Sequence, residues 1–410
     1  MRGGAIVGGP LARRNRAGTR TSLQNSGRPA AQAATPMKPI LKVSLVVALV
    51  GFFVLGSAAF FVACTVSNLR ISGGSLHSGV EANRVETHEL TLELGQPVRA
   101  QVDCGTIHVS SGSSARVVAR LRAFGSDKED AQKRLATMSL ELGPNSVAGH
   151  EHQDHSLKFF EFGGGEEIDL ELTLPEGTRL EVHSGSGDVR IQGGFGDTRA
   201  GSDYGDLALS GIRGTLLAKS SSGEIQADEI QGASVRIETS YGDIELRQIQ
   251  ATQLEAHTSS GEIEARALQC ERVLLSSDYG DIAVRELKGD LDSKTSSGEV
   301  RIADARGACH AHSDYGDVEA EGVFSSLWLS SSSGSIHGRA RAGSTLSEGW
   351  ELASDYGEVA LELPAGLSFA LDASTDYGEV QTDLPGAQIG GGGPRLRLHS
   401  SSGDVSIRVR

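Results

Sequence analysis

Residues 239–281 decide the fold; they read TSYGDIELRQIQATQLEAH, then TSSGEIEARALQCERVLLS, then SDYGD. Each copy begins with Ser or Thr, reaches a glycine three residues later and continues with Asp or Glu. The three glycines, Gly242, Gly261 and Gly280, are equally spaced. A fixed period, here about 19 residues, predicts a stack of one repeated supersecondary unit rather than a globular core.

The same turn recurs far beyond this stretch, from Ser184 to Asp404. The first eight steps between its glycines are nearly equal in length, and the last three are longer and unequal. Ser and Tyr alternate before most of these glycines, so the full repeat is a pair of units, about 37 residues long. The turn glycines are Gly187, Gly205, Gly223, Gly242, Gly261, Gly280, Gly298, Gly316, Gly334, Gly357, Gly378 and Gly403.

Within a unit, apolar and polar residues alternate over two short stretches. In one unit, Ile225 and Ala227 form the first apolar pair and Val235 and Ile237 form the second, with Ile230 between them. Such alternation is typical of half-buried β-strands. We therefore predict an all-β fold, a parallel β-solenoid of about twelve coils. The alternative is a long antiparallel meander with the glycines in hairpin loops, but it gives no reason for residues one period apart to match.

The turn glycines are predicted to be structural. A left-handed backbone conformation costs little only for Gly, so we expect positive φ at glycines such as Gly261 and Gly280 in consecutive coils. The Ser, Thr and Asp side chains beside them can bond local backbone groups and hold the turn. The acids after the glycines are expected to be solvated, although a row of carboxylates could also bind calcium. No metal or other cofactor is predicted.

Two segments precede the predicted repeats. Residues 1–42 contain eight Lys or Arg and no Asp or Glu, and residues 43–66 are uncharged, apolar and long enough to span a bilayer. This charge distribution predicts a cytoplasmic N-terminus, a membrane as the partner of residues 43–66, and repeats in the periplasm or at the cell surface. A second possibility is a true start at Met37 followed by an export signal, with Cys64 as a candidate for lipid attachment.

Residues 67–183 form a predicted lead-in module, and residues 184–410 form the repeats. Strand-like stretches in the module flank one short helix, which is predicted to begin at Ser126 with a Ser-x-x-Glu capping box and to end at about Met138. The fragment at residues 103–109 already has the pattern of a degenerate coil. The lead-in module is therefore expected to join directly onto the solenoid.

These features together resemble a known family. The basic tail, the apolar segment, the Gly-x-Ile-x-Val strand of residues 105–109, the Leu-Pro-x-Gly stretch of residues 174–177 and the serial Gly-acid turns are similar to the bacterial cell-envelope "putative adhesin" family. The resemblance covers residues 90–410. It implies a β-helical fold on the cell envelope and a proposed role in adhesion, with envelope-stress signalling in some relatives. It supplies no catalytic motif.

A row of tyrosines is the candidate ligand surface. Tyr is rigid and amphipathic, which suits binding to sugars or to a protein partner; the alternative is that each ring only covers the neighbouring coil. Trp328, which lies between two inward leucines, is expected to point outward and is a further candidate, whereas Trp350 is expected to point inward. The tyrosines of the row are Tyr204, Tyr241, Tyr279, Tyr315, Tyr356 and Tyr377.

Composition narrows the function classes. The net charge is −15, and the sequence has no basic groove or zinc-finger spacing, which argues against nucleic acid as a partner. Paired catalytic carboxylates need distinct environments, whereas the turn acids repeat in one environment. We therefore expect a non-enzymatic adhesion, scaffolding or ligand-binding surface, with an envelope polysaccharide or a membrane protein as partner. An envelope-stress signalling component and a polysaccharide-active enzyme are the two alternatives.

Overall fold

The structure, a computed structural model, describes most of the chain after residue 68. The described ranges are residues 69–72, 75–151, 165–346, 349–384 and 393–410. They belong to one compact unit, Val66–Arg410. No helix within these ranges is long and apolar enough to cross a membrane. The predicted basic arm, the apolar segment at residues 43–66 and Cys64 lie outside the described residues.

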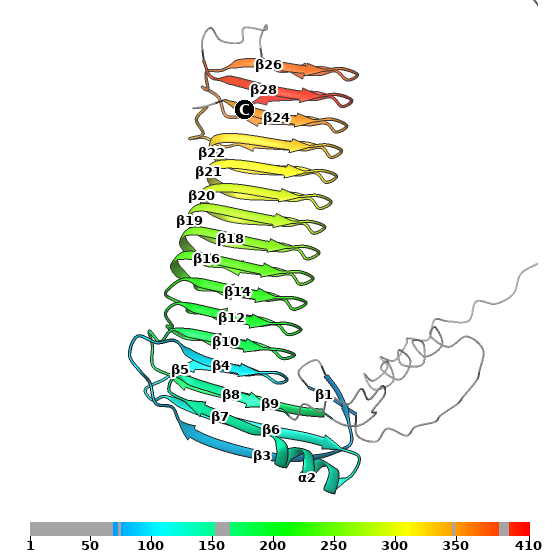
Figure 1. The fold of residues 1–410 in the computed structure, drawn as a ribbon. Helices are drawn as coiled ribbons and strands as arrows, with labels where there is room; N and C mark the ends of the chain where they lie inside the picture. Colours follow the sequence, from blue (N-terminus) through cyan, green and yellow to red (C-terminus); the bar gives the residue numbers. More distant parts are fainter. Residues whose placement is uncertain (1–68, 73–74, 152–164, 347–348, 385–392) are drawn as a thin grey trace, which may run out of the picture. The chain divides into compact units, whose positions relative to one another are not determined.

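From Leu180 onward the chain forms a parallel β-solenoid, as the period predicted (Figure 1). Each coil has one strand segment before its turn glycine and one after it. Equivalent segments of neighbouring coils pair in parallel, and we call the two resulting stacks the pre-turn ladder and the post-turn ladder. The parallel pairing rules out the antiparallel meander.

The strands of the two ladders are as follows. The pre-turn ladder contains β10 (Leu180–Ser184), β12 (Thr198–Ser202), β14 (Leu216–Ser220), β16 (Gln231–Thr239), β18 (Gln250–Thr258), β24 (Trp350–Ser354), β26 (Ala370–Thr375) and β28 (Arg395–Ser400). The post-turn ladder contains β11 (Val189–Gln192), β13 (Leu207–Ser210), β15 (Ile225–Asp228), β17 (Ile244–Arg247), β23 (Ile336–Ala340), β25 (Val359–Leu363), β27 (Val380–Thr382) and β29 (Val405–Val409). Four long strands run through the post-turn ladder of one coil and the pre-turn ladder of the next: β19 (Ile263–Ser277), β20 (Ile282–Thr295), β21 (Val300–Ser313) and β22 (Val318–Ser331).

The coils follow the order of the sequence for about ten turns, from β10 and β11 to β24 and β25, and the order then changes. Strand β28 pairs with both β24 and β26, and β29 pairs with both β25 and β27. The coil made by the last strands of the chain therefore lies between two coils that precede it in sequence, as Figure 1 shows for β24, β28 and β26. The predicted dozen successive coils are thus corrected to about ten, followed by two in exchanged order.

The core consists of apolar columns that run along the stack. Equivalent residues such as Ile244, Ile263 and Ile282 are paired in register and are at most 1% exposed. Trp350 is buried, as predicted, and its ring meets that of Phe324 edge-on with 6.3 Å between the centroids. The Trp350 side chain fills the coil in which the repeat first lengthens. Burial of these thin aliphatic layers supplies the main driving force for folding.

The lead-in module closes the first end of the solenoid with antiparallel strands. Strand β6 pairs antiparallel with both β3 and β9, whereas β4 and β5 pair in parallel with β10 and β11. Strands β4 and β5 are therefore the coil before the first regular one, which agrees with the degenerate coil predicted at residues 103–109. The strands of the module are β1 (Leu69–Ser72), β2 (Ser75–Ser78), β3 (Val80–Glu89), β4 (Val98–Val102), β5 (Ile107–Ser111), β6 (Arg116–Gly125), β7 (Ser139–Gly143), β8 (Ser146–His150) and β9 (Gly165–Leu174).

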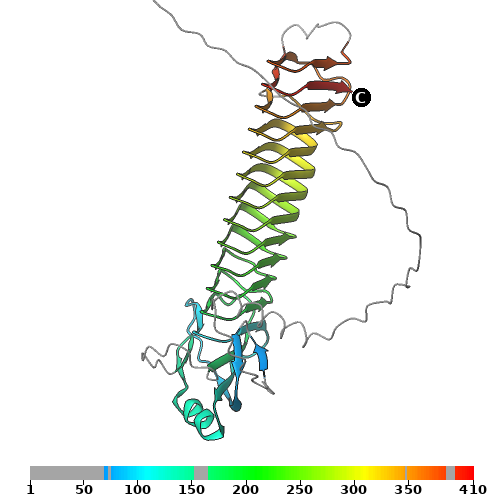
Figure 2. The same cartoon turned by 90° about the vertical axis from the view of Figure 1, so that its right-hand side faces the viewer.

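The predicted short helix is α2 (Lys128–Thr137), which packs against β6 and β3. It lies at the end of the lead-in module that is farthest from the coils (Figure 2). Its N-cap is Asp127 rather than Ser126. The Asp127 carboxylate accepts the backbone N–H of Asp130 at 2.9 Å, and the Asp130 carboxylate accepts the backbone N–H of Ser126 at 2.9 Å. The two side chains satisfy N–H groups that have no partner within the helix. The capping box is therefore displaced by one residue from the predicted position.

Candidate functional site

The twelve turns between the two ladders stack into one edge of the solenoid. We call it the turn edge. In each turn it comprises the two residues before the turn glycine, the glycine itself and the residue after it. A hydroxyl supports each turn and is buried in all of them except that of Thr375. The Ser277 hydroxyl accepts the N–H of Gly280 at 2.8 Å and donates to the carbonyl of Gly261, one coil earlier, at 2.9 Å. The same pair of bonds is made by Ser184, Ser202, Ser220, Thr239, Thr258, Ser277, Thr295, Ser313, Ser331, Ser354, Thr375 and Ser400.

The turn glycines are required by space and not by φ, which corrects the sequence prediction. None of the twelve, including Gly261 and Gly280, has a positive φ. A Cβ atom added to Gly280 would lie 1.9 Å from the carbonyl oxygen of Gly261, and the other eleven glycines would meet the adjacent coil at 1.9–2.3 Å. Glycine therefore allows neighbouring turns to stack at a distance that a side chain would prevent.

Positive φ occurs instead at the opposite end of the coil, which we call the bend. In five consecutive coils the residue in the left-handed region carries a side chain, with φ between 51° and 58°. Such a conformation costs about 1–2 kcal/mol for a non-glycine residue. These residues are Glu229, Gln248, Ala267, Glu286 and Asp304.

Aspartates after the turn glycine connect neighbouring coils. One carboxylate oxygen of Asp243 accepts the backbone N–H of Glu262 at 2.8 Å, and Asp281 accepts that of Glu299 at 2.8 Å. These carboxylates therefore have a structural role. Among the described residues, no group of three or more His, Cys, Asp or Glu side chains is placed to hold a metal ion. The aspartates that make this bond are Asp188, Asp206, Asp243, Asp281, Asp317 and Asp404.

The six tyrosines of the predicted row project from the turn edge, and their side chains are 70–87% exposed. In the sequence, Tyr356 and Tyr377 belong to successive turns and break the alternation of Ser with Tyr. The exchanged order of the last coils restores it, because Gly403 stacks on Gly357 and Gly378 stacks on Gly403. Ser turns and Tyr turns therefore alternate along the whole stack of twelve, and no two Tyr turns are neighbours.

Trp328 points outward from β22 and is 52% exposed, as its position between two leucines predicted. It lies on the outer face of the pre-turn ladder, opposite Glu351 of β24, and so is not part of the turn edge. Its ring contacts His310 of β21 edge-on, with 5.5 Å between the centroids. Trp328 and the tyrosines are therefore two separate aromatic surfaces.

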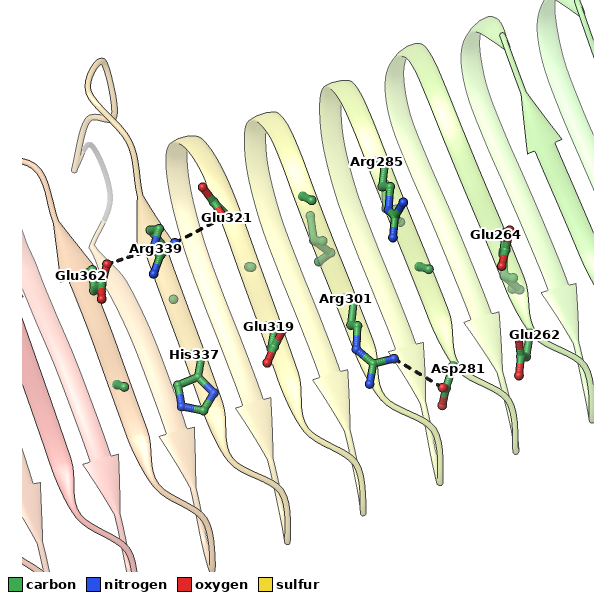
Figure 3. A pocket seen from close by; sticks show the side chains of 18 residues that line it. Glu262, Glu264, Asp281, Arg285, Arg301, Glu319, Glu321, His337, Arg339 and Glu362 are labelled. Carbon is green, nitrogen blue, oxygen red and sulfur yellow. Dashed lines mark hydrogen bonds and ion pairs between the residues drawn. The ribbon is translucent and has the colours of Figure 1, made fainter.

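A shallow groove of about 640 Å³ crosses the outer face of the post-turn ladder, from β19 to β25 (Figure 3). Half of its eighteen lining residues are charged. Arg301 lies 3.7 Å from Asp281, and Arg339 lies between Glu362 at 2.8 Å and Glu321 at 3.8 Å. Exposed ion pairs of this kind contribute about 0–1 kcal/mol each. The groove was not predicted, because its residues read from the sequence as the outward positions of strands.

Burial raises the pKa of three titratable groups among the described residues. Burial raises the pKa of Glu151 to about 8, against the effect of a hydrogen bond that its carboxylate accepts from the Cys104 backbone N–H. Burial also raises the pKa of the Cys309 thiol to about 12 and shifts that of Cys270 upward. Thiols of this kind are protonated and unreactive. None of these groups lies in the turn edge.

The regular coils, the lead-in coil and the stacked Gly-acid turns define a repeat protein of the parallel β-solenoid class. The sequence profile of the Toastrack family, DUF4097, matches residues 106–274, 214–352 and 253–408. These overlapping matches span most of the chain, which therefore belongs to this family. The resemblance to an adhesin-like β-strand-repeat family of unknown function is thereby confirmed. No curated protein matches the chain at a significant level.

Solved structures give a distant similarity. A "putative adhesin" from Bacteroides fragilis is 11% identical with a TM-score of 0.23, and the match covers 80% of this chain and 97% of that chain. A "putative cell adhesion protein" from Clostridium sporogenes is 10% identical with a TM-score of 0.18, covering 80% and 100%. A "putative lipid binding protein" from Parabacteroides distasonis is 12% identical with a TM-score of 0.31, covering 80% and 96%.

Two features of the turn edge were missed from the sequence. The first is the bond from each hydroxyl to the neighbouring coil, such as that of Ser277 to Gly261. The local bond of these Ser and Thr side chains to the turn was predicted and is confirmed. The second is the exchanged order of the last coils. Its signal was the break in the Ser–Tyr alternation at Tyr356 and Tyr377.

Proposed function

We propose that this protein is a binding or scaffolding rod that holds an extended ligand along its turn edge, without catalysis. The observation that carries the proposal is the row of six tyrosines, 70–87% exposed, at one position of alternate coils. Exposed apolar surface that is concentrated in one place marks interaction sites, and Tyr is enriched among the residues that dominate binding energy. A row that repeats along the stack suits a ligand that is itself extended and repetitive.

The fixed backbone beneath the rings supports the proposal. The Tyr279 N–H donates to the Ser259 carbonyl at 3.1 Å, and the Tyr315 N–H donates to the Ser296 carbonyl at 3.1 Å. The buried hydroxyls and the aspartates hold the same turns. Binding to groups that are already ordered loses less conformational entropy. The alternative role, covering the neighbouring coil, suits the rings less well because most of their surface faces solvent.

We also propose that the repeats are exported and held at a membrane. This rests on the eight basic residues of the 1–42 segment and on the uncharged 43–66 segment. Protease added to intact spheroplasts should then degrade residues 67–410, and complete protection would place them in the cytoplasm. Mass spectrometry of the mature N-terminus would separate an intact spanning segment from a chain that begins at a lipid-modified Cys64.

The binding role is tested by changing Tyr279, Tyr315 and Tyr356 together to Ser. Ser occupies this position in the neighbouring coils, so the variant should unfold at the same temperature as the wild type. Retention of ligands by the purified full-length protein is measured on an array of envelope polysaccharides and peptides. The triple variant should lose the retention, whereas the control Trp328→Ser should keep it. The reverse result would place the site on the pre-turn ladder. Turnover of an envelope polysaccharide that is lost on removing one acid would reveal an enzyme instead.

A further inference from the structure

The spacing of the tyrosines is set by the stacking of the coils. Neighbouring strands of a parallel sheet lie about 4.8 Å apart. Because Tyr occurs in every second coil, the rings repeat about every 9.6 Å. The exchanged order of the last coils keeps this spacing between Tyr356 and Tyr377, which would otherwise occupy adjacent coils. The six tyrosines therefore occupy every second coil of the stack, which gives five equal intervals.

This interval distinguishes among the regular conformations of a peptide. A β-strand presents one face every two residues, or about 6.7 Å. An α-helix presents one face every 3.6 residues, or about 5.4 Å, and its nearest approach to the interval is two turns, which are seven residues or about 10.5 Å. A polyproline II helix has three residues per turn and presents one face about every 9.3 Å. Over five intervals the mismatch reaches about 1.5 Å for polyproline II and about 4.5 Å for the α-helix. Polyproline II fits the row best.

The charge of the turn edge specifies the ligand further. The turn edge contains sixteen Asp or Glu residues and no Lys, Arg or His. Only four of these acids form an ion pair with another described residue: Asp188, Asp281, Glu299 and Asp314. The sixteen are Asp188, Asp203, Asp206, Glu224, Asp243, Glu262, Asp278, Asp281, Glu299, Asp314, Asp317, Asp355, Glu358, Asp376, Glu379 and Asp404. A negatively charged turn edge favours a positively charged ligand.

We infer that the turn edge binds a basic, proline-rich segment of a partner protein in the polyproline II conformation. This inference rests on the proposed function, because it names the ligand of the same tyrosine row. Prolines at every third position pack against the Tyr rings, since aromatic surfaces recognise polyproline II segments and little entropy is lost in ordering them. Lys or Arg at the intervening positions pairs with the flanking carboxylates, such as those of Asp278, Asp314 and Asp355.

The test uses a labelled peptide of six Pro-Pro-Lys repeats and the full-length protein, with binding measured by fluorescence anisotropy at low salt. A peptide of six Gly-Gly-Lys repeats matches its charge and length but not its conformation, and six Pro-Pro-Glu repeats match its conformation with the opposite charge. We expect the Pro-Pro-Lys peptide to bind at least tenfold more tightly than the Gly-Gly-Lys peptide, and the Pro-Pro-Glu peptide not to bind. Equal affinity for the two basic peptides would overturn the inference, because it would reduce the interaction to charge alone.

Two protein variants separate the rings from the carboxylates. Changing Tyr279, Tyr315 and Tyr356 to Ser should lower the affinity for the Pro-Pro-Lys peptide at least tenfold. Changing Asp278, Asp314 and Asp355 to Ser should also lower it and should flatten its dependence on salt. Ser stands at both positions in neighbouring coils, such as Ser296 and Ser297, so both variants should fold. The control Trp328→Ser should bind like the wild type.

The outcomes also separate this inference from the proposed function. If a polysaccharide binds in a Tyr-dependent way and the Pro-Pro-Lys peptide does not bind, the inference is wrong and the binding role stands. If neither ligand is retained in a Tyr-dependent way, both are wrong. If the peptide binds but the Tyr variant binds it equally well, the tyrosine row is not the site and the inference fails.

Discussion

The chain reverses direction twice in every coil, at the turn edge and at the bend, and the two reversals differ in their residues and in their backbone conformation. At the turn edge, all twelve coils have a glycine and none of these glycines has a positive φ. At the bend, five consecutive coils have a positive φ at residues that carry side chains. Neighbouring backbones leave no room for a Cβ atom at the turn edge, whereas the bend has room but needs an unusual φ. A glycine that recurs at a turn therefore indicates a close approach of backbones as readily as a left-handed conformation.

The conformational strain of the positive φ at the bend is offset by the burial of the residue that follows. Ala267 at φ 57° precedes Leu268, which is fully buried, and Gln248 at φ 51° precedes Ile249, which is 1% exposed. The left-handed residue thus directs an aliphatic anchor into the core. Burial of such a side chain stabilises by about 1.5–3 kcal/mol, which exceeds the cost of about 1–2 kcal/mol for the conformation.

The largest expected effect tests the order of the last coils, on which the regular turn edge depends. His399 lies beside Ala353 on one side and beside Ser374 on the other. A bifunctional thiol reagent that spans neighbouring strands should therefore cross-link Ala353→Cys with His399→Cys. It should not link Ala353→Cys with Ser374→Cys, which are two coils, or about 9.6 Å, apart. Mass spectrometry of proteolytic fragments identifies the products. The opposite pattern would mean that the coils stack in the order of the sequence.

Gly280→Ala should lower the free energy of unfolding by about 3 kcal/mol, since overpacking of this kind typically costs 1–3 kcal/mol. The reason is the carbonyl oxygen of Gly261, which lies 1.9 Å from the added Cβ position. Gly366 is the matched control: its φ is 91° and no atom lies within 4 Å of an added Cβ. Gly366→Ala should cost only about 1 kcal/mol. Equal losses in urea unfolding would show that space is not the constraint at the turn edge.

Ser277→Ala should lower the free energy of unfolding by about 2 kcal/mol. The substitution leaves the Gly280 N–H and the Gly261 carbonyl without the hydroxyl that joins them, and an unsatisfied buried polar group costs about 1–3 kcal/mol. Ser277→Thr should cost much less, because Thr258 and Thr295 make the same two bonds in the adjacent coils. Urea unfolding of the two variants measures the difference. A similar loss in both would assign the effect to packing rather than to the hydroxyl.

Much of the fold could be predicted because a solenoid repeats its register. One assignment of inward and outward positions applies to every coil, so the buried Ile263 and the outward Trp328 both followed from the alternation. The φ of the turn glycines could not be predicted in this way, because a close backbone contact and a left-handed turn both select glycine. The contact became visible only when Gly261 and Gly280 were placed in adjacent coils.

The sequence identified the residues of the candidate site but not how they are arranged in space. The tyrosines were identified from their position before the glycine, and their exposure agrees with an outward row. Their uniform spacing depends on the exchanged coils. Sequence order does not fix spatial order there, because the longer steps from Gly357 to Gly378 and from Gly378 to Gly403 let the chain pass one coil and return. Which ligand the row binds depends on spacing and charge together, and the spacing required the structure.

The smallest expected effect belongs to the bend. Ala267→Gly should raise the free energy of unfolding by about 0.5 kcal/mol, because it removes about 1–2 kcal/mol of strain at φ 57° but adds about 0.4–1 kcal/mol of entropy to the unfolded chain. Ala267→Val should act in the opposite direction, because a β-branched residue fits this region worst. The control Glu264→Gln, an outward change on the same strand, should stay within about 0.5 kcal/mol of the wild type. If Ala267→Gly destabilises instead, the positive φ does not cost stability at the bend. The two ends of the coil would then differ only in the close backbone contact at the turn glycines.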